Sequence, residues 1–432
     1  MKLGSIEDLY SIYTTHPSVV TDTRKLKSGD LYFALKGPNF NGNVFAIAAL
    51  EAGAAYAIVD EAIADSDSYQ DRIIFVDDVL TTLQALAKYH RQQFNIPFIA
   101  ITGSNGKTTT KELVYAVLAS HFNTYTTQGN LNNHIGVPLT LLSIPKNADM
   151  AVIEMGANHQ KEIESYCSYT LPTHGMITNC GKAHLEGFGS EEGVKKGKGE
   201  LFDFIRANNG AVFLMEDFDY LVQMAQGIPH VIGYGQHSGV IQGEAMDTDG
   251  MLTVNINKGI ALDTIATHLV GNYNLPNVLA AITIGQYFKV PNEKIKAAIE
   301  NYIPTNSRSQ LVQWKNNEVI LDAYNANPSS MKLAVENFAK MNKGYKIVCL
   351  GGMRELGADT LMEHQMLIDQ LKQTNWSEVL LVGSEFKPCD HNYHYFDTVQ
   401  EAKVWLHAQA LKGYTLLIKG SRGIQMEQLI AP

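Results

Sequence analysis

AITGSNGKTTTKEL, residues 100–113, is the stretch that decides the fold. It follows an apolar run and contains Gly103 and Gly106, then Lys107 and Thr108 at the start of a helical pattern. Glycines let the backbone wrap around phosphate oxygens, and a helix that begins there directs unpaired N–H groups at the anion. Lys107 is expected to reach the β- and γ-phosphates, and Thr108 to place its hydroxyl on Mg²⁺. The loop is shorter than the common GxxxxGK[ST] form, and the alternative is a glycine turn that caps a helix.

Short apolar runs that end in glycine recur along the chain, and helical patterns lie between them. The apolar runs are 96–103, 149–156, 345–352, 378–383 and 414–420, and the clearest helical patterns are 108–120, 330–340 and 361–373. A buried run that ends in glycine before a helix is typical of a parallel strand in a doubly wound sheet. The sequence therefore predicts an α/β protein with at least two sheets. Polar breaks near 95–97 and 304–308 predict three domains, 1–95, 96–308 and 309–432.

The bulk composition narrows the class of protein. A chain of 432 residues is too long to fold around a single hydrophobic core, which agrees with several domains. The formal net charge of −10 argues against a general nucleic-acid binder, which needs a basic surface. Four widely spaced cysteines suit a reducing cytosol, and no segment resembles a signal peptide or a membrane span of roughly 20 apolar residues. We expect a cytoplasmic protein that binds neither nucleic acid nor membrane.

The loop TGSNGKTT (102–109) resembles that of the Mur ligase superfamily, which includes folylpolyglutamate synthetase. Further blocks resemble the branch of this family that adds D-alanyl-D-alanine. They are TQGNLNNHIGVPLTLL (127–142), VIEMGANHQKEI (152–163), AHLEGFGSEEGVKKGKGELF (183–202), DAYNANPSSM (322–331) and KGSRGIQME (419–427). The resemblance implies a small UDP-substrate-binding domain, a central P-loop ATPase-like domain and a C-terminal Rossmann-like domain for the dipeptide. It also implies a monomeric ATP-dependent ligase that joins D-Ala-D-Ala to a UDP-muramoyl tripeptide through an acyl phosphate, in peptidoglycan precursor synthesis.

Four residues are the implied catalytic centre: Lys107, Glu154, His184 and Lys198. The resemblance assigns Mg²⁺ to Thr108, Glu154, His184 and Lys198, with Lys198 as a carbamate, the product of its amine with CO₂. Glu154 ends an apolar run, and a carboxylate at a strand end suits Mg²⁺, although a solvent-facing acid is the alternative. A carbamate supplies oxygen ligands where an ammonium would repel a metal. His184 could instead be structural, and the neighbouring Lys195 and Lys196 are best explained as a solvated basic face.

The implied ATP contacts extend beyond the phosphate loop. They are Gly103, Ser104, Asn105, Gly106, Lys107, Thr108, Thr109, Asn274, Asn277, Arg308, Asp322 and Asn327. Asn274 and Asn277 share one helix face, and amides can read an adenine edge because they donate and accept. Asp322 is the acid expected at the ribose. Relatives usually carry histidine at Tyr273 and serine at Ala323, so neither position is assigned a role.

The substrate contacts follow from two further blocks. VTDTRKLKSGDLYFALKGPNFNGNVF (20–45) resembles the UDP-binding part of the family, with Thr23, Arg24 and Lys36 as contacts and Asn43 where histidine is usual. Asn132 and Asn133 in the block 127–142 are assigned to the substrate as well. The loop GGMRELG (351–357) carries Gly352 where relatives usually have aspartate, which leaves the dipeptide site the least defined.

Three other functions are compatible with parts of this pattern. Another amide ligase, for a single amino acid or for folate, is disfavoured by GNLNN (129–133) and DAYNANP (322–328). A P-loop kinase or motor ATPase needs neither a carbamate lysine nor the stretch HLEGFG (184–189), which is rich in glycine and is predicted to form a loop. A silent relative that serves as a binding module would not need the intact catalytic residues. The third position of the tripeptide, lysine or diaminopimelate, is left open.

Overall fold

The protein is α/β, and its computed structural model describes residues 2–64, 67–248, 250–305 and 307–431. Strands form sheets of four, nine and six members, in the predicted three-domain arrangement, together with a two-stranded ribbon. Packing divides the chain into two compact units, one of residues 1–100, 123–156 and 162–174, and the other of the remainder. The predicted boundary at 304–308 includes Asn306, which lies outside the described residues, and the exact domain bounds stay a prediction.

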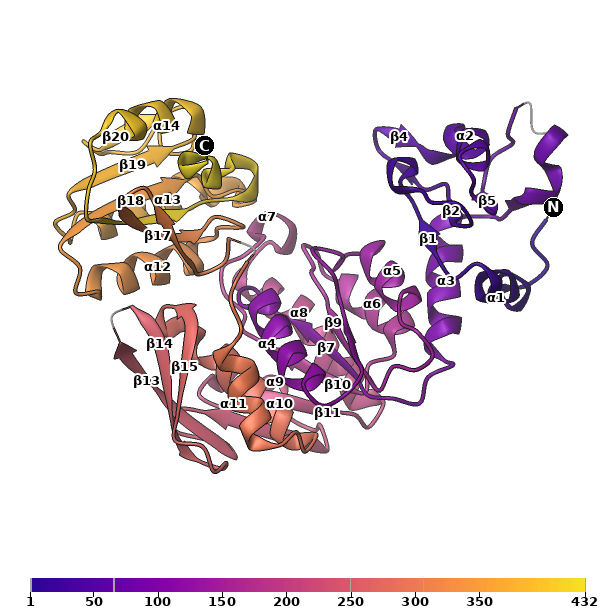
Figure 1. Ribbon diagram of the computed structural model, residues 1–432, viewed down its shortest axis with the longest axis horizontal. Helices are drawn as coiled ribbons and strands as arrows, with labels where there is room; N and C mark the ends of the chain where they lie inside the picture. The colour runs from indigo at the N-terminus through magenta and orange to yellow at the C-terminus, as the bar shows by residue number, and fades with distance from the viewer. Residues whose placement is uncertain (1, 65–66, 249, 306, 432) are drawn as a thin grey trace. The chain divides into compact units, whose positions relative to one another are not determined.

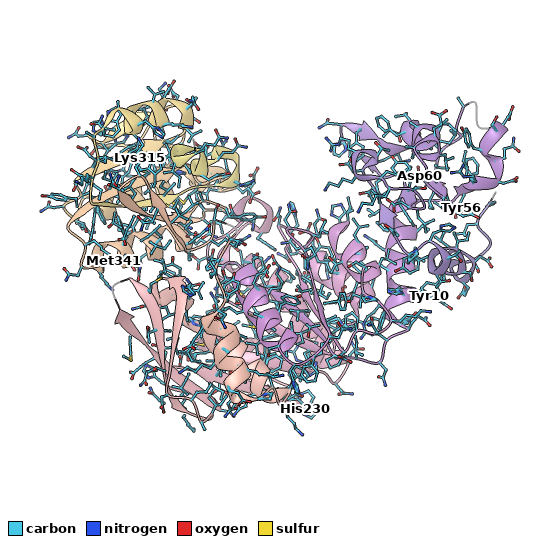
Figure 2. The ribbon with its side chains drawn as sticks, viewed as in Figure 1. Tyr10, Tyr56, Asp60, His230, Lys315 and Met341 are labelled. Atoms are coloured by element: carbon cyan, nitrogen blue, oxygen red, sulfur yellow. The ribbon has the colours of Figure 1, made fainter. Side chains whose placement is uncertain are left out.

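The four-stranded sheet is parallel throughout and has the order β1 (Val19–Val20), β2 (Leu31–Phe33), β5 (Tyr56–Val59) and β6 (Ile73–Phe75). Its strands are short. They are almost wholly apolar because helices cover a parallel sheet and bury its residues. The helices of this region are α1 (Ile6–Thr15), α2 (Ala46–Glu51) and α3 (Val79–Arg91). Ser5 caps α1 and Asp78 caps α3 through side-chain oxygens. Figure 2 labels Tyr56, the first residue of β5, and Asp60, which follows its last residue.

The same unit contains β8 (Thr124–Thr126), β9 (Met150–Glu154), α5 (Gly136–Leu142) and α6 (Glu162–Thr170). Arg91, the last residue of α3, is buried and ties α3 to the end of α6. Its guanidinium donates to the carbonyls of Thr170 at 2.9 Å, Leu171 at 2.9 Å and Phe94 at 3.0 Å. It also lies 3.7 Å from the centre of the Phe98 ring. Burial lowers the pKa of Arg91 to about 10.

The nine-stranded sheet has the order β15-β14-β13-β12-β11-β10-β7-β9-β8. The apolar runs at 96–103 and 149–156 form β7 (Phe98–Thr102) and β9, as predicted. The remaining strands are β10 (His174–Ile177), β11 (Ala211–Met215), β12 (His230–Gly235), β13 (Ile241–Thr248), β14 (Met251–Lys258) and β15 (Thr264–Val270). The sequence did not predict β13–β15, which pair antiparallel. In β14 and β15 buried residues alternate with half-buried or exposed ones, so these strands lack the continuous apolar run of a parallel strand.

The helices of the second unit place the phosphate loop. α4 (Lys107–Ala119) packs against α10 (Leu275–Tyr287) and α11 (Asn292–Glu300), as Figure 1 shows. α10 is apolar on nearly every face and is therefore buried. α8 (Glu191–Ala207) and α9 (Asp219–Met224) lie in the same part of the chain. The predicted loop at HLEGFG is wrong, because Leu185–Phe188 forms the short helix α7 between His184 and Gly189, both left-handed.

The six-stranded sheet has the order β16-β17-β21-β18-β19-β20. Its members are β16 (Gln310–Trp314), β17 (Asn317–Asp322), β18 (Tyr345–Gly351), β19 (Glu378–Val382), β20 (His394–Phe396) and β21 (Tyr414–Lys419), with α12 (Pro328–Lys340), α13 (Thr360–Leu371) and α14 (Val399–Ala408). A hairpin turn at Lys315, labelled in Figure 2, joins β16 and β17. The other strand pairs are parallel, so the residues that follow β17, β18, β19 and β21 gather at one edge.

We expect Arg91→Ala to lower the free energy of unfolding of the first unit by about 2–4 kcal/mol, because buried carbonyls lose a charged donor. Urea denaturation, with hydrogen exchange of the α6 amides, measures the change. Lys88→Ala serves as the control, because Lys88 is an exposed residue of the same helix. It should change the free energy of unfolding by less than about 0.5 kcal/mol. Equal urea midpoints for Arg91→Ala and wild type would contradict the anchoring role.

Candidate functional site

The phosphate loop, residues 103–106, joins β7 to α4 and depends on two glycines. Gly103 has φ +141° and Gly106 has φ +80°, values that favour glycine. A Cβ on Gly103 would overlap Thr178 Oγ1, and one on Gly106 would lie 2.7 Å from Asn277 Oδ1. Both glycines are therefore required by conformation and by space. The predicted strand, loop and helix are confirmed as local structure.

A second segment, Thr178–Gly181, holds the phosphate loop in place. Asn179 accepts from Ser104 N through its carbonyl at 2.8 Å and from Asn105 N through its side chain at 3.0 Å. Ser104 Oγ donates to Gly181 O at 2.9 Å, and Thr178 Oγ1 donates to Asn105 O at 2.6 Å. These bonds order the loop from outside its own sequence. Sequence analysis missed Asn179, whose only signal is its position just after an apolar strand.

Lys107 begins α4, and its ammonium folds back over the loop. Lys107 Nζ donates to Gly103 O at 2.6 Å and to Ser104 O at 3.1 Å. A cation in this position faces the region where the loop amides and the helix N-terminus favour an anion. Thr108 and Thr109 follow in the first turn of α4 and are buried. The loop can therefore stabilise developing phosphate charge from several sides.

Glu154 ends β9 and is 1% exposed. Its Oε1 accepts from Asn132 Nδ2 at 2.7 Å, and its backbone N–H donates to Thr127 Oγ1 at 2.9 Å. Asn133, the neighbouring predicted substrate contact, accepts from the N–H groups of Ile135 and Gly136 at the start of α5. In this structure Asn132 thus orients the carboxylate, and Asn133 bonds the backbone that leads into α5. The substrate role of both asparagines stays a prediction.

Lys198 lies on the buried face of α8 and is 1% exposed. Its ammonium donates to Ala157 O at 2.7 Å and lies 5.0 Å from the ring centre of Phe188, in α7. Burial raises the pKa of the nearby Cys180 to about 12, although the charges of Lys198 and Lys195 lower it. Lys196 on the same helix is exposed, as expected for a solvated face. Lys198 is thus buried, whereas Lys196 is exposed to solvent.

His184 precedes α7 with φ +52° and contacts Glu355 through Nδ1. This contact keeps the pKa of the Glu355 carboxyl below its usual value, with burial opposing the shift. The backbone is joined as well, because Glu186 N donates to Glu355 O at 3.2 Å. Glu355 lies in the GGMRELG loop, and sequence analysis did not single it out. The histidine is therefore oriented by a carboxylate from the C-terminal sheet.

The asparagines expected at adenine, Asn274 and Asn277, are both buried and bonded to each other at 2.9 Å. Asn277 Oδ1 also accepts from Thr110 of α4 at 3.0 Å. Asn274 Nδ2 donates to Val270 O at 2.9 Å and to Ser309 Oγ at 3.2 Å. The amides share a helix face, as predicted, and form a network between α4 and the segment that leads into the third sheet. Their contact with adenine stays a prediction.

Asp322 ends β17 and joins that same segment. Its Oδ1 accepts from Ser309 N at 3.2 Å, and its Oδ2 pairs with the buried Lys419 at 2.5 Å. Arg308 stacks on Tyr324, with 3.7 Å from the guanidinium carbon to the ring centre. Its buried Nε has no hydrogen-bond partner within the described part of the chain. Arg308 and Asp322, predicted to meet one nucleotide, thus flank Ser309.

Asn327 brings the DAYNANP block to the phosphate loop. It caps α12 and donates through Nδ2 to Asn105 Oδ1 at 2.8 Å. Ser329 Oγ accepts from Lys182 N at 3.0 Å, which adds a second link between the same regions. The structure therefore places Asn327 beside the predicted ATP site.

Two residues predicted to bind UDP, Arg24 and Lys36, form ion pairs with carboxylates. Arg24, in the short helix η1 (Thr23–Lys25), pairs with Asp22 through two bonds, and its side chain is 87% exposed. Lys36 lies 3.1 Å from Asp60 and 3.2 Å from Glu61. Burial raises the pKa of Asp60, but bonds from Asn43 and Lys36 outweigh it and leave the pKa below its usual value. Asn43 thus orients Asp60, the residue labelled in Figure 2.

The predicted metal ligands do not form a cluster of ordinary ligand types. Across residues 2–64, 67–248, 250–305 and 307–431, no group of three or more His, Cys, Asp or Glu side chains is arranged to hold a metal. Thr108 and Glu154 supply oxygens, and Lys198 would do so only as a carbamate.

In the same described ranges no helix has the length and apolar character needed to span a membrane.

Models of known families match three segments of the chain. The Mur ligase family catalytic domain matches residues 17–91, and the Mur ligase middle domain matches residues 101–285. The glutamate ligase domain of Mur ligases matches residues 307–422. The three matches follow the order of the three sheets.

Individual relatives match over nearly the whole chain. The UDP-N-acetylmuramoyl-tripeptide–D-alanyl-D-alanine ligase of Bacillus subtilis is 33% identical, over 100% of this chain and 96% of its own. That of Escherichia coli is 35% identical, over 96% and 93%. The crystal structure of MurF from Acinetobacter baumannii has a TM-score of 0.86 at 29% identity, covering 95% and 92%. MurF ligase from Thermotoga maritima in complex with ADP has a TM-score of 0.85 at 25% identity, covering 95% and 96%. The chain therefore belongs to the Mur ligase family.

Proposed function

We propose that this chain joins D-alanyl-D-alanine to UDP-N-acetylmuramoyl-tripeptide, with ATP, in peptidoglycan precursor synthesis. The observation that carries the proposal is full-length similarity to relatives with that name, at 33% and 35% identity. The chain retains a phosphate loop with Lys107, a buried acid at Glu154 and a buried lysine at Lys198. A motor ATPase or kinase would not need the last of these.

The reaction proceeds through an acyl phosphate. The tripeptide carboxylate attacks the γ-phosphorus of ATP and ADP leaves; the dipeptide amine then attacks the acyl carbon, and phosphate leaves with loss of a proton from nitrogen. Lys107 and the loop amides stabilise the charge on the phosphoryl oxygens. The bonds that Lys107 makes to Gly103 O and Ser104 O hold its ammonium beside the loop in advance.

Mg²⁺ fits the donor set in part. The Thr108 hydroxyl and the Glu154 carboxylate are hard oxygen donors of the kind that Mg²⁺ prefers. Asn132 orients Glu154, and Glu355 engages His184 Nδ1, so Nε2 is the ring nitrogen that would be the metal ligand. A carbamate on Lys198 would add oxygens. When bound, Mg²⁺ would neutralise phosphate charge.

The surroundings of Ser309 support closure around ATP. Arg308 and Asp322 lie on either side of it, and Ser307 and Ser309 both have left-handed φ values, +50° and +49°. Contact of phosphate with Arg308 and of ribose with Asp322 would draw the third domain toward the second and exclude water from the acyl phosphate. The first domain would hold the UDP portion. Four thiols without disulfides among the described residues suit the cytoplasm, and a monomer stays a prediction.

Phosphate release should require both the UDP-tripeptide and D-Ala-D-Ala, because only a ligase couples ATP cleavage to both acceptors. A coupled phosphate assay with each component omitted in turn measures this, and mass spectrometry identifies the pentapeptide product. Tripeptides with lysine or diaminopimelate at the third position then define the preferred substrate. Release that continues at the same rate without the dipeptide would instead indicate an ATPase.

Lys107→Ala should lower kcat by about 10²–10³, because it removes one pre-organised charge at the phosphoryl group. The same phosphate assay measures kcat, and circular dichroism checks that the fold is retained. Lys412→Ala, an exposed lysine in a loop of the C-terminal domain, is the control and should behave as wild type. Near-normal turnover of Lys107→Ala would refute its role.

Lys198 should carry a carbamate in the active enzyme, so Lys198→Ala should be nearly inactive. A short carboxylic acid in the buffer should restore part of the activity by replacing the missing oxygens. ¹³C NMR of the wild-type enzyme in ¹³CO₂ provides an independent signal. Lys196→Ala, exposed on the same helix, is the control, and full activity of Lys198→Ala in CO₂-free buffer would exclude the modification.

A further inference from the structure

Glu385 is a buried carboxylate just beyond the end of β19, and the ligase reaction outlined above does not use it. Its side chain is 9% exposed, and Oε1 accepts from Arg354 Nη1 at 3.0 Å. Oε2 is shielded from solvent and has no hydrogen-bond partner in the described ranges of the chain. A buried carboxylate is costly unless a cation compensates it, so Arg354 is a strong partner for this group.

Two glycines make the room that Glu385 occupies. A Cβ on Gly352 would overlap Glu385 Oε2, and a Cβ on Gly383 would lie 2.8 Å from the same atom. Glycine at both positions is therefore a condition for the place that the Glu385 carboxylate takes.

Arg354 is held at its base and exposed at its tip. Its backbone N–H donates to Ser421 Oγ at 3.0 Å, and its side chain is 56% exposed. The next residue, Glu355, has φ +64° and contacts His184. Arg354 therefore presents a guanidinium at the carboxyl edge of the third sheet, one residue from a contact with the predicted catalytic centre.

We propose that Arg354 binds the carboxylate of the incoming dipeptide and that Glu385 positions Arg354 for this task. The inference rests on the proposed function. The dipeptide must direct its amine at the acyl phosphate, so its other end, a carboxylate, needs a fixed cation. A guanidinium binds a carboxylate through a planar fork, and an ion pair to a buried acid restricts its rotamers. Glu385 itself is a positioning residue, since Oε1 faces Arg354 and Oε2 is inaccessible.

The test compares D-Ala-D-Ala with its C-terminal amide, which keeps the amine but lacks the charge. For the wild type, KM for the amide should exceed KM for the free dipeptide by about ten- to hundredfold. In Arg354→Ala, KM for the free dipeptide should rise to the value for the amide, so that the ratio falls to about one. KM for ATP and for the UDP-tripeptide should stay unchanged. Arg354 is exposed, so this variant should fold.

Two further variants examine Glu385 without touching the ligand. Glu385→Gln should raise KM for the free dipeptide less than Arg354→Ala does, and leave KM for the amide unchanged. Gly352→Ala should act in the same direction, because the added Cβ displaces the Glu385 carboxylate. Gly344→Ala is the matched control, since a Cβ there meets nothing within 4 Å. Lys372→Ala, an exposed ion-paired lysine of the same domain, controls for lost positive charge.

The proposal would be overturned if the ratio of KM for the amide to KM for the free dipeptide were the same in Arg354→Ala as in the wild type. So would loss of the preference in Arg422→Ala alone, because Arg422 is another exposed guanidinium near this edge. A Glu385→Gln variant that matches wild type would remove the positioning role. Failure of the proposed function would look different, because the wild type itself would then release phosphate without the dipeptide.

Discussion

The contact of Gly103 with Thr178 is the constraint on which the rest of the site depends. At φ +141°, with no room for a Cβ, the backbone of residue 103 lies directly against the segment that follows β10. This close packing lets Asn179 and Gly181 bond the loop and directs the N-terminus of α4 toward the loop. These bonds join the phosphate loop to the segment that follows β10. A phosphate would meet donors that are already in position, which limits the reorganisation that binding requires.

A second principle is that parallel strands collect functional residues at their carboxyl ends. In the third sheet, Asp322, Arg354 and Glu385 come from three different strand ends, and Lys419 ends a fourth. Each pairs across strands, Asp322 with Lys419 and Glu385 with Arg354. The buried member of each pair fixes its partner, so charges from distant sequence positions form one ordered edge.

Buried amides have a second role beside any ligand contact. Asn274, Asn277 and Ser309 form a continuous network with Thr110 of α4. Inside a protein such groups must be bonded to one another, and a complete network restricts the geometry of the elements it joins. This network reaches from the helix after the phosphate loop to the segment with two left-handed serines. These hydrogen bonds thus join α4 to the segment that leads into the third sheet.

The sequence by itself determined the class of fold and the local structure of the phosphate loop. Apolar runs that end in glycine are local signals. Gly103, Gly106 and Lys107 are also close neighbours in the sequence, so their pattern can be recognised without the tertiary structure. It also placed Glu154 and Asp322 at strand ends, because burial and polarity change sharply there. Only the tertiary structure decided which groups hold these residues: Asn132 holds Glu154, Glu355 holds His184 and Glu385 holds Arg354. Local patterns did not predict the strands β13–β15, which lack a continuous apolar run. They also predicted a loop where α7 forms, because that stretch is rich in glycine. The reason is physical: partners separated by many residues are chosen by packing and charge compensation in three dimensions, and no local spacing encodes them.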